Sequence, residues 1–331
     1  MQQLVFQSVD SGSLSPLRDI TTLIDVSESA ELTYDIDSDV ACSGSFSFAG
    51  NSTLLTQLVR IVLVRDDGTT EPLGTFFADI TDSSRVGVLV RGKVELEGVL
   101  AALRDTCAPT AYVVPGGTSA VAVIRDVCAQ VGRPTAIPDD LSGSSYAECI
   151  IYEAGTPWLT VAQEAAGRCG MLLTQDRMGF IVLREQGADM RKWTLAPGAT
   201  SMVSLISKEL SNSQEPTRVV ATWSNADSAL CAVADAPVRG AHPRDYHLSV
   251  SDIENPSVSV LTALAEQELD AQSGQAAEWK LEMLYEPVEV GTTADITDLV
   301  DPSRLVGTIT SINFSLLPVL TMQLTIRGEV A

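Results

Sequence analysis

Basic residues are scarce in this sequence. Its 331 residues include 21 Lys and Arg against 43 Asp and Glu, which gives a formal net charge of −22. The acidic residues form no terminal tail, so the imbalance reflects the shortage of basic side chains, with only four lysines: Lys93, Lys192, Lys208 and Lys280. A protein that grips duplex DNA through its phosphates needs a basic face. The composition therefore excludes tight nucleic-acid binding of that kind.

Leader signals and long apolar runs are missing as well. Residues 1–10 contain no basic segment followed by an apolar stretch, so we expect no signal peptide. The longest apolar runs, such as 58–64, are interrupted by charged residues and fall short of the roughly 18 residues of a membrane span. We therefore expect a protein that is made and folds in the cytoplasm and has no membrane span.

Paired cysteines are absent too. No two cysteines form a Cys-x-x-Cys motif, and the six are scattered along the chain: Cys42, Cys107, Cys128, Cys149, Cys169 and Cys231. In a reducing compartment such residues serve as small buried hydrophobic side chains, and we interpret them so in preference to a disulfide framework.

Apolar residues are present in the proportion of a globular protein. They make up 45% of the chain and charged residues 19%, which excludes a disordered chain. A chain of this length suits two or three domains, and it buries enough surface to need neither disulfides nor a metal ion.

Strand patterns dominate the first hundred residues. Residues 58–65 are rich in β-branched side chains and end at a turn signal, 66–68. Further strands are predicted over 76–80 and, with apolar residues at alternate positions, over 86–97. One face of these strands is expected to be buried, and the other to be wet or to contact a partner.

Helices appear in the next ninety residues. A short helix is predicted from Val99 to Leu103. A longer one is predicted over 119–131, with Thr118 as its N-cap and Gly132 just past its end. Its buried stripe would consist of Val121, Ile124, Cys128 and Val131.

A second clear helix is predicted to begin at Pro157 and to stop at Gly170, with Thr156 as its cap. Trp158 at its start is interpreted as a core anchor. A hairpin of 171–174 and 180–183 follows, and Asp176 and Gly179 form its turn. Residues 99–187 are therefore predicted to form a small α/β domain.

The remainder is predicted to be mostly β. Residues 217–223 form a strand, and 225–255 form a loop that carries both histidines. A helix over 257–271 is predicted to bury one side, consisting of Val260, Leu261, Leu264 and Leu269. Apolar residues alternate most regularly at the end of the chain, over 312–316 and 320–327.

Motifs of catalysis and cofactor binding are not found. The sequence contains no GxGxxG, GxxxxGK[ST], GxSxG or HExxH pattern. His242 and His247 lie five residues apart, and Cys231 could join them in space. Metal sites prefer three or more ligands, however, so we interpret the histidines as solvated loop residues.

Acidic pairs such as Glu95/Glu97 and Asp139/Asp140 are expected by chance among 43 acids. A glycosidase needs two carboxylates beside an aromatic-lined cleft, and aromatic residues are only 5%. Residues 116–119 at a helix start could bind an anion, but a turn followed by a helix N-terminus is the simpler interpretation. We predict no catalytic, cofactor-binding or metal-binding residues, and no enzyme.

The order of several short segments along the chain resembles that of a known protein family. Residues 72–77 (PLGTFF) resemble a family segment that runs from a first β-hairpin into the next strand, and 112–118 (YVVPGGT) resemble the start of that family's inserted α/β domain. Residues 156–180 and then 204–220, 255–269 and the final hairpin continue the series. Together these segments resemble the phage tail hub family, namely tail-associated proteins of long non-contractile tails and baseplate hubs of contractile ones. The extra glycine at Gly116-Gly117 and the Asp-Arg-Met-Gly turn depart from the pattern of that family.

The resemblance implies a mainly β fold with a small inserted α/β domain (α+β). Tube-like β-barrel domains would cover 1–98, completed by about 188–235, and 236–331 with one helix; the inserted helix–hairpin domain would cover 99–187. The implied function is that of a structural virion protein at the tail tip. It would be a homotrimer that closes the distal end of the tail tube.

The implied partners are the distal tail protein ring, the tape-measure protein and other tail-tip or fibre proteins, with viral DNA only in transit and no cofactor. The acidic residues could line the channel or be ordinary solvated surface. Two further interpretations stay open: a tail-carried cell-wall hydrolase, and another tail component such as a hexameric distal ring or a carbohydrate-binding protein.

Overall fold

The computed structural model describes most of the chain: residues 3–25, 28–50, 58–86, 89–138, 141, 145–185, 187, 189–195, 203–210, 217–224, 229–235, 244–250, 257–273, 277–300, 303–317 and 319–330. They belong to two compact units. Unit 1 consists of residues 1–188, 284–292 and 310–323, and unit 2 of residues 189–283, 293–309 and 324–331. Strands β19 (Ser303–Ser315) and β20 (Thr321–Val330) contribute residues to both.

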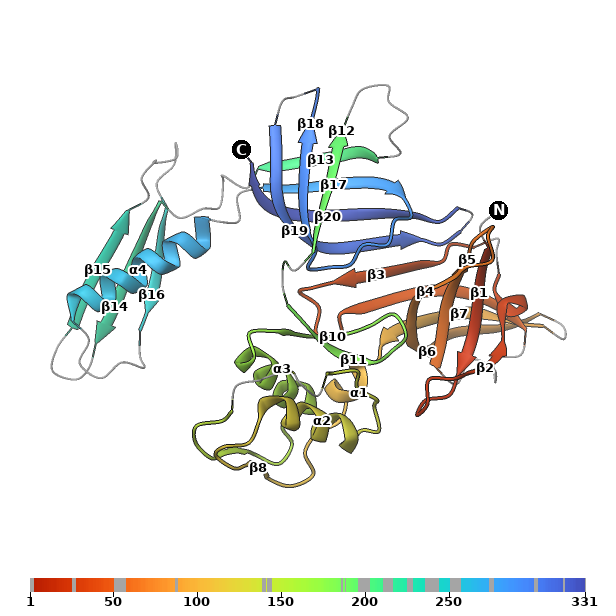
Figure 1. The fold of residues 1–331 in the computed structure, drawn as a ribbon, viewed down its shortest axis with the longest axis horizontal. Helices are drawn as coiled ribbons and strands as arrows, with labels where there is room; N and C mark the ends of the chain where they lie inside the picture. Colours follow the sequence, from red (N-terminus) through yellow and green to blue (C-terminus); the bar gives the residue numbers. More distant parts are fainter. Residues whose placement is uncertain are drawn as a thin grey trace. The chain divides into compact units, whose positions relative to one another are not determined.

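Unit 1 is built on an antiparallel sheet (Figure 1). Its strand order is β19-β3-β4-β7-β6-β5-β1-β2, and β20 pairs with the other side of β19. The strands are β1 (Gln3–Val9), β2 (Pro16–Asp19), β3 (Glu31–Asp35), β4 (Cys42–Gly50), β5 (Leu58–Val64), β6 (Thr70–Val86) and β7 (Leu89–Gly98). A 3-10 turn, η1 (Thr21–Leu23), follows β2. The predicted strands at 58–65 and 76–80 are therefore confirmed. The alternating stretch predicted over 86–97 is divided between two strands, since Val86 ends β6 and β7 begins at Leu89.

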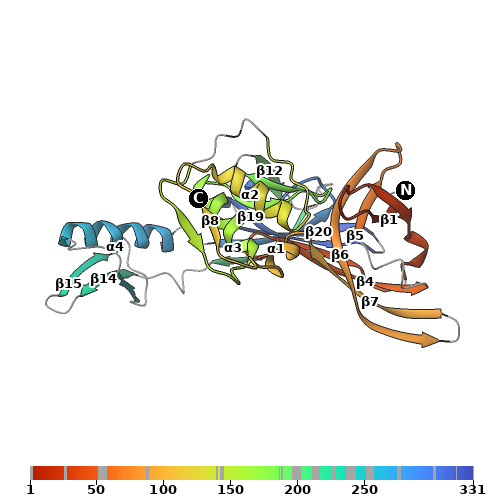
Figure 2. The ribbon, with the colours of Figure 1, turned by 90° about the horizontal axis from the view of Figure 1, so that it is seen from below.

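β6 and β7 form a long hairpin, seen from the side in Figure 2. Its register shifts between Ile80 and Asp82, where a bulge interrupts the ladder. Gly92 lies at this point because a Cβ atom there would come within 2.1 Å of the Asp82 carbonyl oxygen.

The section between β7 and β12 (Met190–Leu195) is the α/β part of unit 1. Its elements are α1 (Ala101–Arg104), β8 (Tyr112–Val114), α2 (Ala120–Gln130), β9 (Ile150–Tyr152), α3 (Trp158–Arg168), β10 (Leu172–Gln175) and β11 (Ile181–Arg184). The predicted helices and the hairpin are confirmed. The hydrophobic core of this section extends onto the main sheet, where it includes Val9, Leu14 and Leu58.

The predicted helix caps were wrong in detail. α2 begins after Ser119 and α3 after Pro157, and neither N-cap position makes a side-chain capping bond. Thr156 instead donates its hydroxyl to the carbonyl of Glu153. The C-terminal signals were right, since Gly132 and Gly170 adopt positive φ angles of 65° and 67°.

Unit 2 contains two groups of strands. In the first, β13 (Val203–Leu210) pairs with β17 (Ala277–Leu284), and β12 pairs in parallel with β18 (Thr293–Asp298), which also pairs with β19. In the second, β14 (Arg218–Ser224) lies between β15 (Ala229–Asp235) and β16 (Asp245–Ser249). Helix α4 (Val258–Ser273) crosses one face of this three-stranded sheet (Figure 1).

The loop predicted for 225–255 was wrong where the structure describes it, because β15 and β16 lie within it. The three-stranded sheet and α4 share a core of their own, made of Val219, Ala221, Trp223, Ala232, Ala234, Leu261, Ala265 and Leu269. Val260 was predicted to be buried but is 41% exposed. The apolar stripe of α4 instead recurs every four residues from Leu261.

The cysteine interpretation was right only in part. Cys42 and Cys128 are buried and Cys169 is half-buried, but Cys107, Cys149 and Cys231 are exposed.

The predicted fold class is confirmed: the chain is mainly β with a small α/β section. Among the described residues no strand pair closes a sheet on itself.

Candidate functional site

One face of the unit 1 sheet carries small polar and acidic side chains. Residues directly opposite each other on neighbouring strands face the same side of a sheet. One such row crosses five strands and consists of Ser315, Glu31, Ser45, Glu95 and Asp79. The next row consists of Asn313, Thr33, Ser43, Glu97 and Phe77. We call these two rows, together with Asp35, the acidic face.

Burial alternates across the sheet as this register requires. The side chains that point to the opposite face are buried: Leu32, Phe46, Val94, Leu96 and Phe314. On the acidic face Glu31, Asp79 and Glu95 are exposed. Its five carboxylates stand among short hydroxyl and amide side chains, and Lys93 and Arg91 follow only further along β7. The acidic face is therefore negatively charged and, Phe77 apart, free of large side chains.

Where β6 pairs with β5, the α/β section covers the same side of the sheet. Arg60, only 3% exposed, lies opposite Thr75 and donates to its hydroxyl over 3.0 Å. Its Nη2 atom also donates to the carbonyls of Leu14 and Met178, both at 2.8 Å. Because Met178 belongs to the β10–β11 turn, this buried guanidinium fastens the α/β section onto the sheet.

Gln175, at the end of β10, makes further hydrogen bonds between the α/β section and the sheet. We call this contact region, formed by Arg60, Thr75, Met178 and Gln175, the seam. Gln175 is 5% exposed, and its Nε2 atom donates to the Thr75 carbonyl over 3.0 Å. Its Oε1 atom accepts a hydrogen bond from the backbone N–H of Val99, the first residue after β7. One side chain therefore satisfies two buried backbone groups.

A second polar cluster joins the β10–β11 turn to residues 284–292 of unit 1. Arg177 donates to the Tyr285 hydroxyl over 2.6 Å and to the Val288 carbonyl over 2.7 Å. Tyr285 in turn donates to Glu71. Burial opposes ionisation of Glu71, but hydrogen bonds from Tyr285 and Arg65 outweigh it and hold the pKa of this carboxyl below its usual value.

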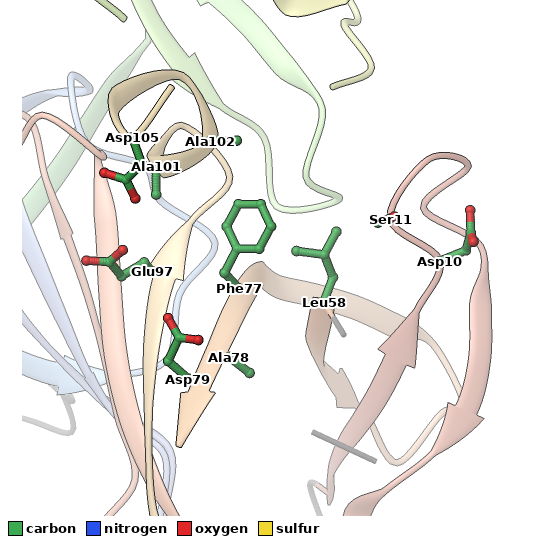
Figure 3. A pocket seen from close by; sticks show the side chains of 10 residues that line it. All are labelled: Asp10, Ser11, Leu58, Phe77, Ala78, Asp79, Glu97, Ala101, Ala102 and Asp105. Atoms are coloured by element: carbon green, nitrogen blue, oxygen red, sulfur yellow. The ribbon is translucent and has the colours of Figure 1, made fainter. Parts of the chain in front are cut away.

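A cavity of about 400 Å³ opens where the acidic face meets α1 (Figure 3). It is lined by Asp10, Ser11, Leu58, Phe77, Ala78, Asp79, Glu97, Ala101, Ala102 and Asp105. Figure 3 shows Asp79, Glu97 and Asp105 gathered on one side of the Phe77 ring, with Ser11 and Asp10 across from them.

Two of these carboxylates have a lowered pKa. Hydrogen bonds from Arg104 lower the pKa of Asp105, and the same guanidinium donates to Glu97 over 3.0 Å. Asp10 accepts three bonds from its own loop, from Ser13 N–H and hydroxyl and from Gly12 N–H, and these lower its pKa. Both groups are therefore charged at neutral pH.

The residues considered from the sequence fall into different places. Glu95 and Glu97, interpreted as a chance pair, lie side by side on the acidic face. Trp158 is 5% exposed and contacts Tyr112 edge-on, which confirms a core anchor. Gly117 has a φ of 85°, as the turn interpretation requires.

His247 lies on β16 and Cys231 on β15, with β14 between them. His242, Asp139 and Asp140 lie outside the described residues. Within the described ranges no three His, Cys, Asp or Glu side chains are grouped as metal ligands, and no helix there is long and apolar enough to cross a membrane.

No protein-family model matches this chain, and no curated protein sequence does. Solved structures match it over almost its whole length. A tail protein from Neisseria meningitidis superposes with a TM-score of 0.68 at 13% identity, covering 99% of this chain and 97% of that one. The 43 kDa tail protein of prophage MuSo2 from Shewanella oneidensis gives 0.66 at 14% identity, covering 98% of both chains. The prophage tail protein gp18 from Listeria monocytogenes gives 0.56 at 11% identity, covering 98% and 94%.

The chain therefore has the fold of phage tail proteins. The resemblance found in the order of its short segments is confirmed at the level of the fold.

Proposed function

We propose that this chain is a structural component of the tail tip, a hub of three copies that closes the distal end of a tail tube. The fold shared with phage tail proteins supports this proposal. In the hub, residues 1–98 and 236–331 would serve as tube-like domains, with 99–187 at the periphery. The neighbours would be the distal tail ring, the tape-measure protein and other tip or fibre proteins.

The acidic face is the observation that gives this hub a mechanism. Glu95 and Asp79 are direct cross-strand neighbours, and like charges in that position destabilise a sheet. Stability of the sheet therefore does not account for this arrangement. A surface that faces passing DNA would account for it, because carboxylates repel phosphates.

In this proposal the acidic face lines the channel, and DNA leaves the particle past it. The chain would have no enzymatic activity, and wall degradation and host recognition would belong to other components. Its place is the virion tail tip.

The oligomer is tested first by the mass of the purified protein in solution and by its copy number in an image reconstruction of the intact tail. Three copies at the tube end agree with the proposal. Six copies would favour a distal tail ring instead, and clearing of a peptidoglycan zymogram would favour a hydrolase.

The channel is tested with particles that carry the triple variant Glu31→Lys, Asp79→Lys and Glu95→Lys. Normal particle yield with slower DNA release, measured with a DNA-binding dye, is expected. A matched variant reverses three exposed acids elsewhere in unit 1: Glu28→Lys, Asp39→Lys and Glu153→Lys. Release at the wild-type rate from both variants would show that the acidic face does not line the channel.

A further inference from the structure

The cavity at the margin of the acidic face combines two kinds of wall. Its floor is apolar and made of one aromatic ring and small or branched side chains: Leu58, Phe77, Ala101 and Ala102. Its rim carries four carboxylates: Asp10, Asp79, Glu97 and Asp105. A ligand that fits both walls has an apolar stem and a positively charged end.

The rim remains negative after the contacts within the chain are counted. Arg104 is hydrogen-bonded to Glu97 and Asp105, and Arg133 lies over the Phe77 ring, so two cations of the chain face four carboxylates. Asp10 is held by hydrogen bonds from its own loop, which carry no charge. Asp79 projects from β6 and is exposed. Charge complementarity therefore calls for a cation from outside the chain.

The volume limits what can enter. About 400 Å³ lies at the small end of ligand pockets, which span roughly 300–1,000 Å³. A side chain of a partner protein fits this space, whereas a folded segment does not.

We infer that this cavity receives an arginine side chain presented by a partner protein, with its guanidinium between Phe77 and the carboxylates and its methylenes on the alanine floor. A guanidinium is planar, stacks on aromatic rings and forms paired hydrogen bonds with carboxylates. The compact ammonium of lysine matches this geometry less well.

The protein already makes both contacts with its own arginines. The Arg133 guanidinium lies 5.3 Å from the centre of the Phe77 ring. Arg104 lies 3.0 Å from the carboxylate oxygens of Glu97 and Asp105. An incoming arginine would repeat these two contacts within one cavity.

That the partner is another tail component rests on the proposed function. The chemistry of the cavity does not, and a small probe tests it in the purified protein whatever its oligomeric state. The probe is Nα-acetyl-arginine amide, compared with its uncharged analogue Nα-acetyl-citrulline amide and with Nα-acetyl-lysine amide.

The measurement is a titration of the full chain labelled with ¹³C at alanine methyl groups, followed by NMR. Saturable shifts are expected at Ala101 and Ala102 with the arginine amide, and none at Ala265, a core residue of α4. The lysine amide is expected to bind more weakly, and the citrulline amide to cause no saturable shift. The shifts should weaken as salt is raised.

Two variants complete the test. Asp79→Asn is expected to raise the dissociation constant of the arginine amide about fivefold, since it removes one exposed carboxylate that would pair with the guanidinium. Ala102→Leu fills the floor and is expected to abolish binding. The control Asp39→Asn removes an equal charge from an exposed position outside the cavity and should leave binding unchanged.

Three results would overturn the inference: equal binding of citrulline and arginine, no shift at Ala101 and Ala102, or binding that Asp79→Asn leaves intact. A hub that proves trimeric without an arginine-binding cavity would leave the proposed function standing. Arginine binding in the cavity of a protein that does not form a hub would support this inference and contradict the proposed function.

Discussion

Two regions of one sheet face differ sharply although they share strand β6. Around Thr75 the face is sealed by Arg60 and Gln175, whose hydrogen bonds reach the α/β section. From Phe77 onward the same face is open and carries carboxylates. Two residues along one strand therefore separate a buried seam from a solvated surface.

The difference shows how a charged side chain can serve opposite purposes. In the covered region a single positive charge is buried, and every contact named for it is a hydrogen bond to an oxygen of another segment. In the open region several negative charges face solvent and repel one another. The first arrangement holds two segments together, and the second leaves the carboxylates exposed to solvent.

The largest effect is expected from Arg60→Ala. It leaves the Leu14 and Met178 carbonyls without this donor, which should lower the free energy of unfolding by about 3 kcal/mol. Chemical denaturation measures it. Arg18→Ala, at an exposed position on the edge strand β2, should stay within about 0.5 kcal/mol of the wild type. Equal losses of unfolding free energy in the two variants would show that the Arg60 hydrogen bonds do not hold the α/β section onto the sheet.

A smaller loss is expected from Gln175→Ala. The Val99 N–H and the Thr75 carbonyl would both lose their side-chain partner, at a cost of about 2 kcal/mol. Hydrogen exchange of the Val99 amide should speed up in the variant. Gln130→Ala, at the exposed end of α2, is the control. Unchanged protection of Val99 would show that this bond does not hold the seam.

Acid is expected to weaken the cluster around Glu71. The pKa of this carboxyl is lower in the folded chain than in the unfolded one, so its stabilising contribution is present above the unfolded pKa and is lost as the pH falls through the folded pKa. The free energy of unfolding of the wild type should exceed that of Glu71→Gln at neutral pH, and the gap should close in acid. A gap that is independent of pH would contradict this assignment.

The smallest effect on stability is expected on the acidic face. Glu95→Gln relieves repulsion with Asp79 and should change the free energy of unfolding by no more than about 0.5 kcal/mol, in the stabilising direction. Thermal unfolding at low salt measures it. A clear destabilisation would mean that Glu95 has a structural role and would blur the difference between the two regions.

The sequence was a good guide to elements with strong periodicity. The alternation over 320–327 matches buried Leu320, Met322, Leu324 and Ile326. Helices α2 and α3 were found because glycines end them and apolar residues recur on one side. Such signals lie within one element and need no knowledge of its neighbours.

The failures have a common cause. β15 consists mostly of alanine and other small residues and β16 mostly of polar ones, so neither shows the β-branched pattern of a strand, and both depend on β14 and α4. The acidic face was missed for a similar reason. Its carboxylates come from residues 31–35, 79 and 95–97, and only the register of β3, β4, β7 and β6 brings them together.

The pairing of Leu210 with Ala277 has a practical consequence. These residues are direct neighbours in the β13–β17 ladder, and the sheet of β14–β16 with α4 and its separate core lies in the chain between them. We therefore expect that this module can be replaced, because the two residues that flank it, Leu210 and Ala277, are already one strand spacing apart. Replacing it with a short turn, or with a fluorescent domain whose termini are close together, should leave the β13–β17 ladder intact and offer a way to label this protein.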